Sequence, residues 1–294
     1  PLAKARVAPR EASMNEEQLA ALRGRLPDDF SKVLLEGSLR VLADIQNPIR
    51  LNHFAGSMRE LFTHLLHEMA PDHSVRQCPW FPAERDARAR ENPQLADADL
   101  DRPTRRQRAT YAIQGGITDQ QIIAYGFEPE DVHAEFRDAV QELNRLTHVR
   151  PEAVVQAADE VERRSTAILE ALHNFYQALD HCRDRISDAI FSAVQRAAFD
   201  ELTREAIGDL DILSQHTFVE GPAIDEIRVL RIDAAKIYFL ITGEVDVELN
   251  YGSGDDGVSM NEAFPFELTM EAPVTEPDRF ENVACQVDTD SFYE

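Results

Sequence analysis

The chain has 294 residues, of which 43% are hydrophobic, and it carries 54 acidic against 30 basic residues, a net charge of −24. This composition supports a hydrophobic core and excludes a chain that is disordered throughout. No apolar run reaches the roughly 18 residues needed to cross a membrane, and residues 1–13 lack the apolar stretch of a signal peptide. Cys78, Cys182 and Cys285 are too widely spaced to predict a disulfide framework or a zinc site. We therefore expect a cytoplasmic protein with no membrane segment.

The charge is unevenly distributed along the chain. Residues 1–110 hold 17 basic and 16 acidic residues, whereas residues 200–294 hold 5 basic and 23 acidic residues. Because an acidic surface repels phosphate groups, contacts with nucleic acid are expected within the first 110 residues. The simplest interpretation of the acidic last third is that it keeps the protein soluble.

Residues 1–14 are expected to form a flexible N-terminus, and three helices follow over residues 15–69. In the third, from about Ile49 to Met69, apolar residues recur every three or four positions and predict one buried face. The five prolines of residues 71–104 indicate a long connection with little regular structure, which in a compact domain is usually functional or disordered. Shorter helices are expected near residues 104–114, 118–125 and 128–148.

A long helix is predicted from Pro151, a favourable first helical residue, to about Ile207, with Gly208 as its C-cap. From Val154 to Ala189 its apolar residues alternate in steps of four and three. This heptad spacing is typical of a seam that packs on another long helix, in the same chain or in a second copy. We expect a homo-oligomer, most simply a dimer, and, because the helix would be about 85 Å long at about 1.5 Å per residue, a break or kink within it.

After Gly208 the hydrophobic period changes from helical spacing to two. Val245, Val247 and Leu249 alternate with acidic residues, and the same pattern recurs near residues 227–229, 264–270 and 283–287. Such alternation predicts antiparallel strands with one face wet, joined in one place by a loop over residues 251–257. The expected fold class is α+β: a mainly helical part over residues 15–207, then a small antiparallel β-rich domain over residues 208–294 that folds separately.

The segment Arg59-Glu-Leu-Phe-Thr-His64, in the third helix, is the main candidate for catalysis. Metal-free RNA cleavage needs a group that moves protons near neutral pH and a cation that holds the phosphate, which histidine and arginine supply. On a regular helix Arg59 and His64 lie roughly 140° apart and flank the polar face. Glu60 could pair with His64 and orient its ring. The alternative is a surface arginine and histidine without chemistry, since this spacing occurs by chance in many helices.

A basic cluster is the candidate nucleic-acid contact. It consists of Arg102, Arg105, Arg106 and Arg108, followed by Tyr111. The arginines could grip phosphates while the tyrosine ring stacks on a base, or the cluster could simply pair with nearby acidic residues.

A divalent metal site is a weaker candidate. Its potential ligands are His53, His64, His67, Glu68, Asp72 and His73. No known ligand spacing is present among them, so we expect these to be polar residues on the outer face of a helix, with no metal and no other cofactor.

Several stretches of the chain resemble the predicted pPIWI-associating nuclease family of bacteria. These stretches are residues 47–55, 57–64, 78–81 and 104–116, together with residues 247–255 and 262–266 in the β domain. The Arg59–His64 spacing also matches the R-x4-6-H pattern of HEPN ribonucleases. Glu60, however, stands where those proteins usually have a small polar residue, and this departure puts an ordinary HEPN mechanism in question.

The resemblance implies a HEPN-like endoribonuclease that acts in prokaryotic anti-phage defence. RNA, such as tRNA or another cellular RNA, would be the substrate, Arg59, His64 and Glu60 would form the site, and a second protein of the same defence system would be a partner. The alternative is a non-catalytic interaction module, which would assemble through its long helix and dock a partner through its acidic β domain.

Overall fold

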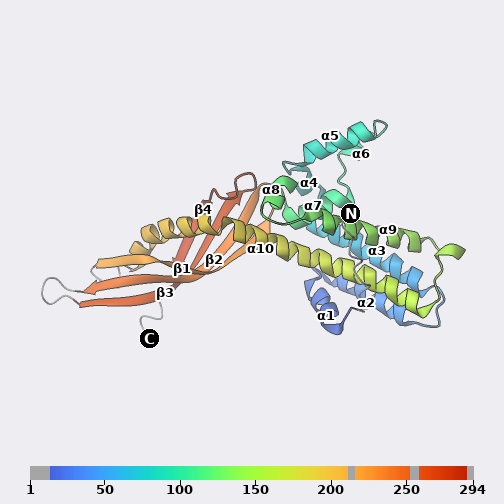
Figure 1. Cartoon of the computed structure of the whole chain (residues 1–294), viewed down its shortest axis with the longest axis horizontal. Helices are drawn as coiled ribbons and strands as arrows, with labels where there is room; N and C mark the ends of the chain where they lie inside the picture. The colour runs from blue at the N-terminus through green and yellow to red at the C-terminus, as the bar shows by residue number, and fades with distance from the viewer. Residues whose placement is uncertain (1–13, 211–215, 252–257, 290–294) are drawn as a thin grey trace, which may run out of the picture. The chain divides into compact units, whose positions relative to one another are not determined.

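The computed structural model describes residues 14–210, 216–251 and 258–289. Helices precede a four-stranded antiparallel sheet, which confirms the predicted α+β class (Figure 1). The chain divides into two compact units, each made from two stretches of sequence: Pro1–Met69 with Glu130–Ala178, and Ala70–Pro129 with Leu179–Glu294. We call the first the helical unit and the second the sheet unit.

The helical unit contains three N-terminal helices in the order that the sequence predicts. They are α1 (Glu16–Arg25), α2 (Asp29–Ala43) and α3 (Arg50–Met69). Asn15 and Asp28 begin α1 and α2, because each side chain accepts a hydrogen bond from the backbone N–H three residues further on. These caps fix where both helices start.

Aromatic rings join α3 to the two other helices of this unit, α9 (Pro129–Thr147) and the first part of α10 (Ala158–Leu210). The ring of Phe136 lies 5.2 Å from that of Phe62 and 4.9 Å from that of Phe175, measured between centroids. All three residues are buried. Burial of each ring contributes about 1.5–3 kcal/mol, so this stack is a substantial part of the core.

The long helix differs from the prediction at both ends. Pro151 does not start it, because Pro151–Ala153 forms a separate 3-10 turn, η1, and α10 begins at Ala158. Asn52 holds this turn in place, since its side-chain amide donates to the carbonyls of Leu146 (2.8 Å) and Ala153 (3.1 Å). From Ala158 the helix runs for 53 residues to Leu210, past Gly208, and the expected break is not present.

The connection expected over residues 71–104 also proves to be structured. It holds three short helices, α4 (Asp72–Arg76), α5 (Phe81–Glu91) and α6 (Asp97–Leu100). Arg85 pairs with Asp97 and Asp101, and Arg88 donates to backbone carbonyls of the segment that follows α6 and of α6 itself. Ion pairs and carbonyl contacts, rather than a periodic apolar face, therefore hold α5 and α6 together, and hydrophobic periodicity could not reveal them.

The sheet unit ends in four antiparallel strands, as the alternating pattern predicts (Figure 1). The strands are β1 (His216–Ile232), β2 (Lys236–Tyr251), β3 (Val258–Pro273) and β4 (Glu281–Val287), and they pair in sequence order. Alternate residues of β2 and β3 are buried, so the sheet has one apolar face. The loop predicted over residues 251–257 falls almost entirely outside the described residues.

The turn between β1 and β2 packs closely on the Gly115-Gly116 loop. This loop connects α7 (Arg105–Gln114) to α8 (Asp119–Ala124). The Gly116 N–H donates to the Asp233 carbonyl at 2.9 Å, and the Trp80 indole donates to the Gly115 carbonyl at 2.9 Å. Residues 70–129 and the sheet thus form one compact unit, which differs from the domain boundary expected at Gly208.

The heptad seam of α10 is covered within a single chain. Its buried members are Val161, Ser165, Ile168, Leu172, Phe175, Leu179, Cys182 and Ile186. Further along, Phe199 packs on β1, where a Cβ added to Gly221 would lie 3.6 Å from the Phe199 ring. A dimer of this protein would therefore need a surface other than the seam.

Candidate functional site

His64, the histidine of the predicted motif, pairs with a carboxylate that the motif does not contain. Its Nε2 atom lies 2.6 Å from Oδ2 of Asp28, the N-cap of α2. The pKa of Asp28 is lowered to about 2, first by the backbone N–H of Ser31 and then by the hydrogen bond to His64. Asp28 is therefore ionised at neutral pH and fixes the imidazole, which remains 23% exposed.

Two aromatic residues lie close to this pair. The Phe30 ring meets the His64 ring edge to face, with 5.0 Å between centroids. Tyr176, from α10, is near enough to Asp28 to feel its charge, although burial is the main cause that raises the pKa of its hydroxyl to about 12. That hydroxyl is buried and has no hydrogen-bond partner among the described residues, while the Arg25 guanidinium lies 5.1 Å from the ring centroid.

The other two predicted catalytic residues pair with each other. Nη2 of Arg59 lies 2.9 Å from Oε1 of Glu60. The expected contact between Glu60 and His64 is replaced by this pair and by the contact of His64 with Asp28. The sequence motif contains His64 but not the carboxylate that contacts it, because Asp28 lies 36 residues away on another helix.

The basic cluster separates into exposed and buried members. Arg102, Arg105 and Arg106 are exposed, whereas Arg108 is only 3% exposed. Arg108 donates to the Ala70 carbonyl at 2.5 Å and pairs with Asp72.

Tyr111 is also buried, 9% exposed, and burial raises the pKa of its hydroxyl. The prediction that Arg108 and Tyr111 contact nucleic acid is therefore corrected, because both residues pack into the core of the sheet unit and a phosphate or base cannot reach them. The three exposed arginines keep that role as a prediction.

The thiols and the predicted metal ligands complete the set of candidates. Burial raises the pKa of both Cys78 and Cys182 to about 12, so these thiols are protonated at neutral pH and are poor nucleophiles. Within the part of the chain that the structure describes, no group of three or more His, Cys, Asp and Glu side chains is placed to hold a metal ion.

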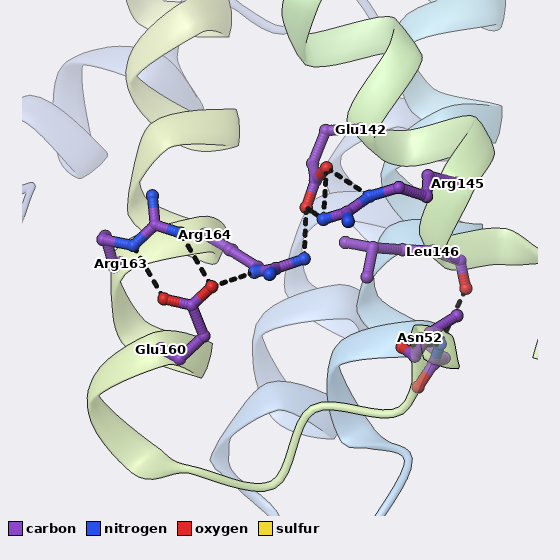
Figure 2. A network of polar contacts seen from close by, with 8 residues as sticks. Asn52, Glu142, Arg145, Leu146, Glu160, Arg163 and Arg164 are labelled. Atoms are coloured by element: carbon purple, nitrogen blue, oxygen red, sulfur yellow. Dashed lines mark hydrogen bonds and ion pairs between the residues drawn. The ribbon is translucent and has the colours of Figure 1, made fainter. Parts of the chain in front are cut away.

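A charged network between α9 and α10 was not predicted (Figure 2). Glu142 accepts from Arg145 and Arg164, and Glu160 accepts from Arg163 and Arg164, with nitrogen–oxygen distances of 2.5–3.0 Å. The network borders a hollow of about 490 Å³ whose lining also includes Ala139, Ile168 and Ala171. Its signal in the sequence is the i, i+3 and i, i+4 spacing of glutamate and arginine.

The pairing within this network favours a structural role for its arginines over the binding of an anion. Arg164 is 18% exposed and bridges the two carboxylates, so its charge is already neutralised. The pKa of Glu160 is lowered to about 2 by Arg163 and then Arg164, so this carboxylate is ionised at neutral pH. We interpret the network as a clamp that joins α9 to the start of α10.

A second hollow, of about 560 Å³, lies on the sheet. Asp225, Glu244, Glu267 and Asp288 are among its lining residues. These carboxylates would repel the phosphate backbone of RNA or DNA, so this hollow is a poor nucleic-acid site.

Family comparisons cover nearly the whole chain. One family model, described as "predicted pPIWI-associating nuclease", matches residues 23–172, and a second with the same description matches residues 179–293. The chain belongs to this family. No curated protein and no solved structure matched it, and no described helix is long and apolar enough to cross a membrane.

Membership of the pPIWI-associating nuclease family supports a nuclease role. The first match contains α3 with His64 and Arg59, α2 with Asp28, and the exposed arginines that precede and begin α7. The join between the two matches falls inside α10, close to the division between the helical and sheet units at Ala178.

Proposed function

We propose that this pPIWI-associating nuclease is a metal-independent endoribonuclease that acts as the effector of a prokaryotic anti-phage defence system. The observation that carries the proposal is the 2.6 Å contact between His64 and Asp28 at a partly exposed position. A carboxylate that binds one imidazole nitrogen orients the ring and leaves the other nitrogen to exchange a proton with a substrate.

In the proposed reaction the 2′-hydroxyl of a ribose attacks the adjacent phosphorus. Nδ1 of His64 accepts the hydroxyl proton while the O2′–P bond forms. The P–O5′ bond then breaks, and the proton held by the imidazolium is available to the departing 5′ oxygen. The products are a 2′,3′-cyclic phosphate and a 5′-hydroxyl, and the overall reaction consumes no proton and needs no metal.

Charge must also be stabilised on the phosphate during this reaction. Arg59, the arginine of the motif, can donate to a phosphate oxygen once it exchanges its partner Glu60 for the substrate. Arg102, Arg105 and Arg106, which belong to the sheet unit, are proposed as a separate phosphate contact, since all three are exposed and lie in the part of the sequence that is not acidic overall.

The test compares purified variants on total RNA and tRNA, with and without EDTA. His64→Ala and Arg59→Ala should each lower the cleavage rate by about 10²–10⁴, the usual contribution of a general base or a charge-stabilising group. Asp28→Asn is the more discriminating change, because asparagine remains a good N-cap for α2 but removes the negative charge that binds the imidazole.

His53→Ala is the matched control, since His53 is an exposed histidine of α3 that contacts Asn47. Cleavage should survive EDTA and leave a cyclic phosphate or a 3′-phosphate. Loss of activity in EDTA that manganese restores, or full activity in His64→Ala, would contradict the proposal.

A second candidate is a non-catalytic interaction module of a defence complex. It is favoured by the fact that Arg59 and His64 both contact carboxylates of the same chain and line neither of the two hollows described above. Its acidic sheet would dock a basic surface of a partner. Under this hypothesis Asp28→Asn would lower stability and leave no cleavage to lose, whereas charge reversal on the sheet would abolish partner binding.

A further inference from the structure

Phe30 is an exposed aromatic residue at the start of α2. It is the second residue of α2 and is 55% exposed, and Val33, one turn further along, is 67% exposed. Because residues three apart are neighbours on a helix, the two side chains form a small exposed apolar surface. Here the exposed ring is also a direct neighbour of His64, which it contacts edge to face at 5.0 Å between centroids.

Several carboxylates of α2 and α3 are paired, so their charge is partly neutralised. Four carboxylates of α2 and α3 have a cationic or imidazole partner: Asp28 with His64, Asp29 with Lys32, Glu36 with Arg23, and Glu60 with Arg59. Arg25, on α1, adds a further guanidinium beside Tyr176. Pairing of these four carboxylates lowers the electrostatic repulsion that a phosphate backbone would meet at this surface.

We propose that the Phe30 ring stacks on an unpaired nucleobase and so presents the adjacent phosphodiester to His64. The substrate class is then single-stranded RNA, because a base inside a duplex has no free face to offer. Val33 extends the apolar surface for the same base or its sugar. This inference rests on the proposed ribonuclease function and adds the feature of RNA that the site recognises.

The decisive experiment measures binding and single-turnover cleavage of a fluorescent single-stranded RNA and of the same strand with an abasic site at the cleavage position. Phe30→Ala should weaken binding of the intact strand by about 5- to 150-fold, the loss that one stacked base accounts for. Phe30→Trp should retain binding. The parent and Phe30→Ala should bind the abasic strand equally, since that strand has no base to stack at the cleavage position.

Ile45→Ala is the control, because Ile45 is 74% exposed in the same unit and follows the C-terminal end of α2, whereas Phe30 lies at its start. Equal binding of the intact strand by the parent and by Phe30→Ala, or binding of no RNA by the parent, would overturn the inference. So would a change of oligomeric state in Phe30→Ala on sedimentation, which would make this surface a contact between copies. If the parent binds single strands through Phe30 but cleaves none, stacking holds and the ribonuclease proposal alone fails.

Discussion

Substituting Gly116 by alanine should weaken the packing of the β1–β2 turn on the Gly115-Gly116 loop and so destabilise the sheet unit. A Cβ atom at this position would lie 2.1 Å from the carbonyl oxygen of Ala234 and 2.7 Å from its carbonyl carbon. These are backbone atoms of the β1–β2 turn and cannot rotate away. The turn must move, which breaks the 2.9 Å hydrogen bond from the Gly116 N–H to Asp233.

The expected loss combines two effects. Overpacking in a closely packed region costs about 1–3 kcal/mol, and loss of a hydrogen bond adds about 0.5–1.5 kcal/mol. We therefore expect Gly116→Ala to lower the free energy of unfolding of the sheet unit by about 2–4 kcal/mol.

Trp80 makes this prediction directly measurable. It is the single tryptophan of the chain, its indole donates to the Gly115 carbonyl, and it packs in the same buried cluster as Ala234. Its fluorescence during urea unfolding should show an earlier transition in Gly116→Ala, while the parent and the control Gly37→Ala unfold later. Gly37 lies within α2 with no atom near an added Cβ, so alanine there should stabilise its helix by about 0.5–1 kcal/mol. A Gly116→Ala protein whose Trp80 transition matches the parent would refute the reasoning.

Three further predictions concern other contacts. Arg108→Met should lower the free energy of unfolding by about 3 kcal/mol in a urea titration, which is at the low end for a broken buried pair because Asp72 is 42% exposed. In the same titration the control Arg105→Met, at an exposed site, should change this free energy by less than about 0.5 kcal/mol. The pKa of Asp28 is lowered from 3.8 to about 2 in the folded state, so its contribution to stability is complete above about pH 4 and is lost as the pH falls through 2. Because His64→Ala removes one cause of this shift, acid unfolding of that variant, followed by circular dichroism, should begin at a higher pH than that of the parent. A chain that ends at residue 207 should lose the Trp80 cluster, because Ala234 and the partner of Gly116 are removed, and retention of parental Trp80 fluorescence in it would support the boundary at Gly208 instead.

Hydrophobic periodicity predicted the elements that bury a regular face. It located α3, whose apolar residues recur in steps of three and four, and the strands, whose residues alternate. It did not find α5 and α6, because Arg85 and Arg88 hold them through acidic side chains and carbonyls. Nor could it show that η1 and Asn52 delay the start of α10 by seven residues relative to Pro151.

The candidate site was predicted only in part for a related reason. A motif records residues that are close in sequence, and it therefore found His64 but assigned it the wrong carboxylate. Asp28 belongs to another helix and was recognisable only as an N-cap. Composition likewise grouped Arg108 with its neighbours, although Arg108, four residues after the cap Thr104, points inward while Arg105 and Arg106 remain exposed.

Charge pairing around His64 gives the proposed site an electrostatic character of its own. At physiological ionic strength exposed charges act over about 8 Å, so a net charge of −24 spread over the chain matters less to a bound phosphate than the pairs beside it. In the helical unit Asp28, Asp29, Glu36 and Glu60 each pair with a cation or an imidazole. The hollow on the sheet, by contrast, is lined by Asp225, Glu244, Glu267 and Asp288. The proposed RNA-binding surface of the helical unit is therefore less repulsive to phosphate than the hollow on the sheet. An acidic sheet of this kind limits non-specific binding of nucleic acid, which would otherwise compete with the single-stranded RNA that the helical unit is proposed to cut.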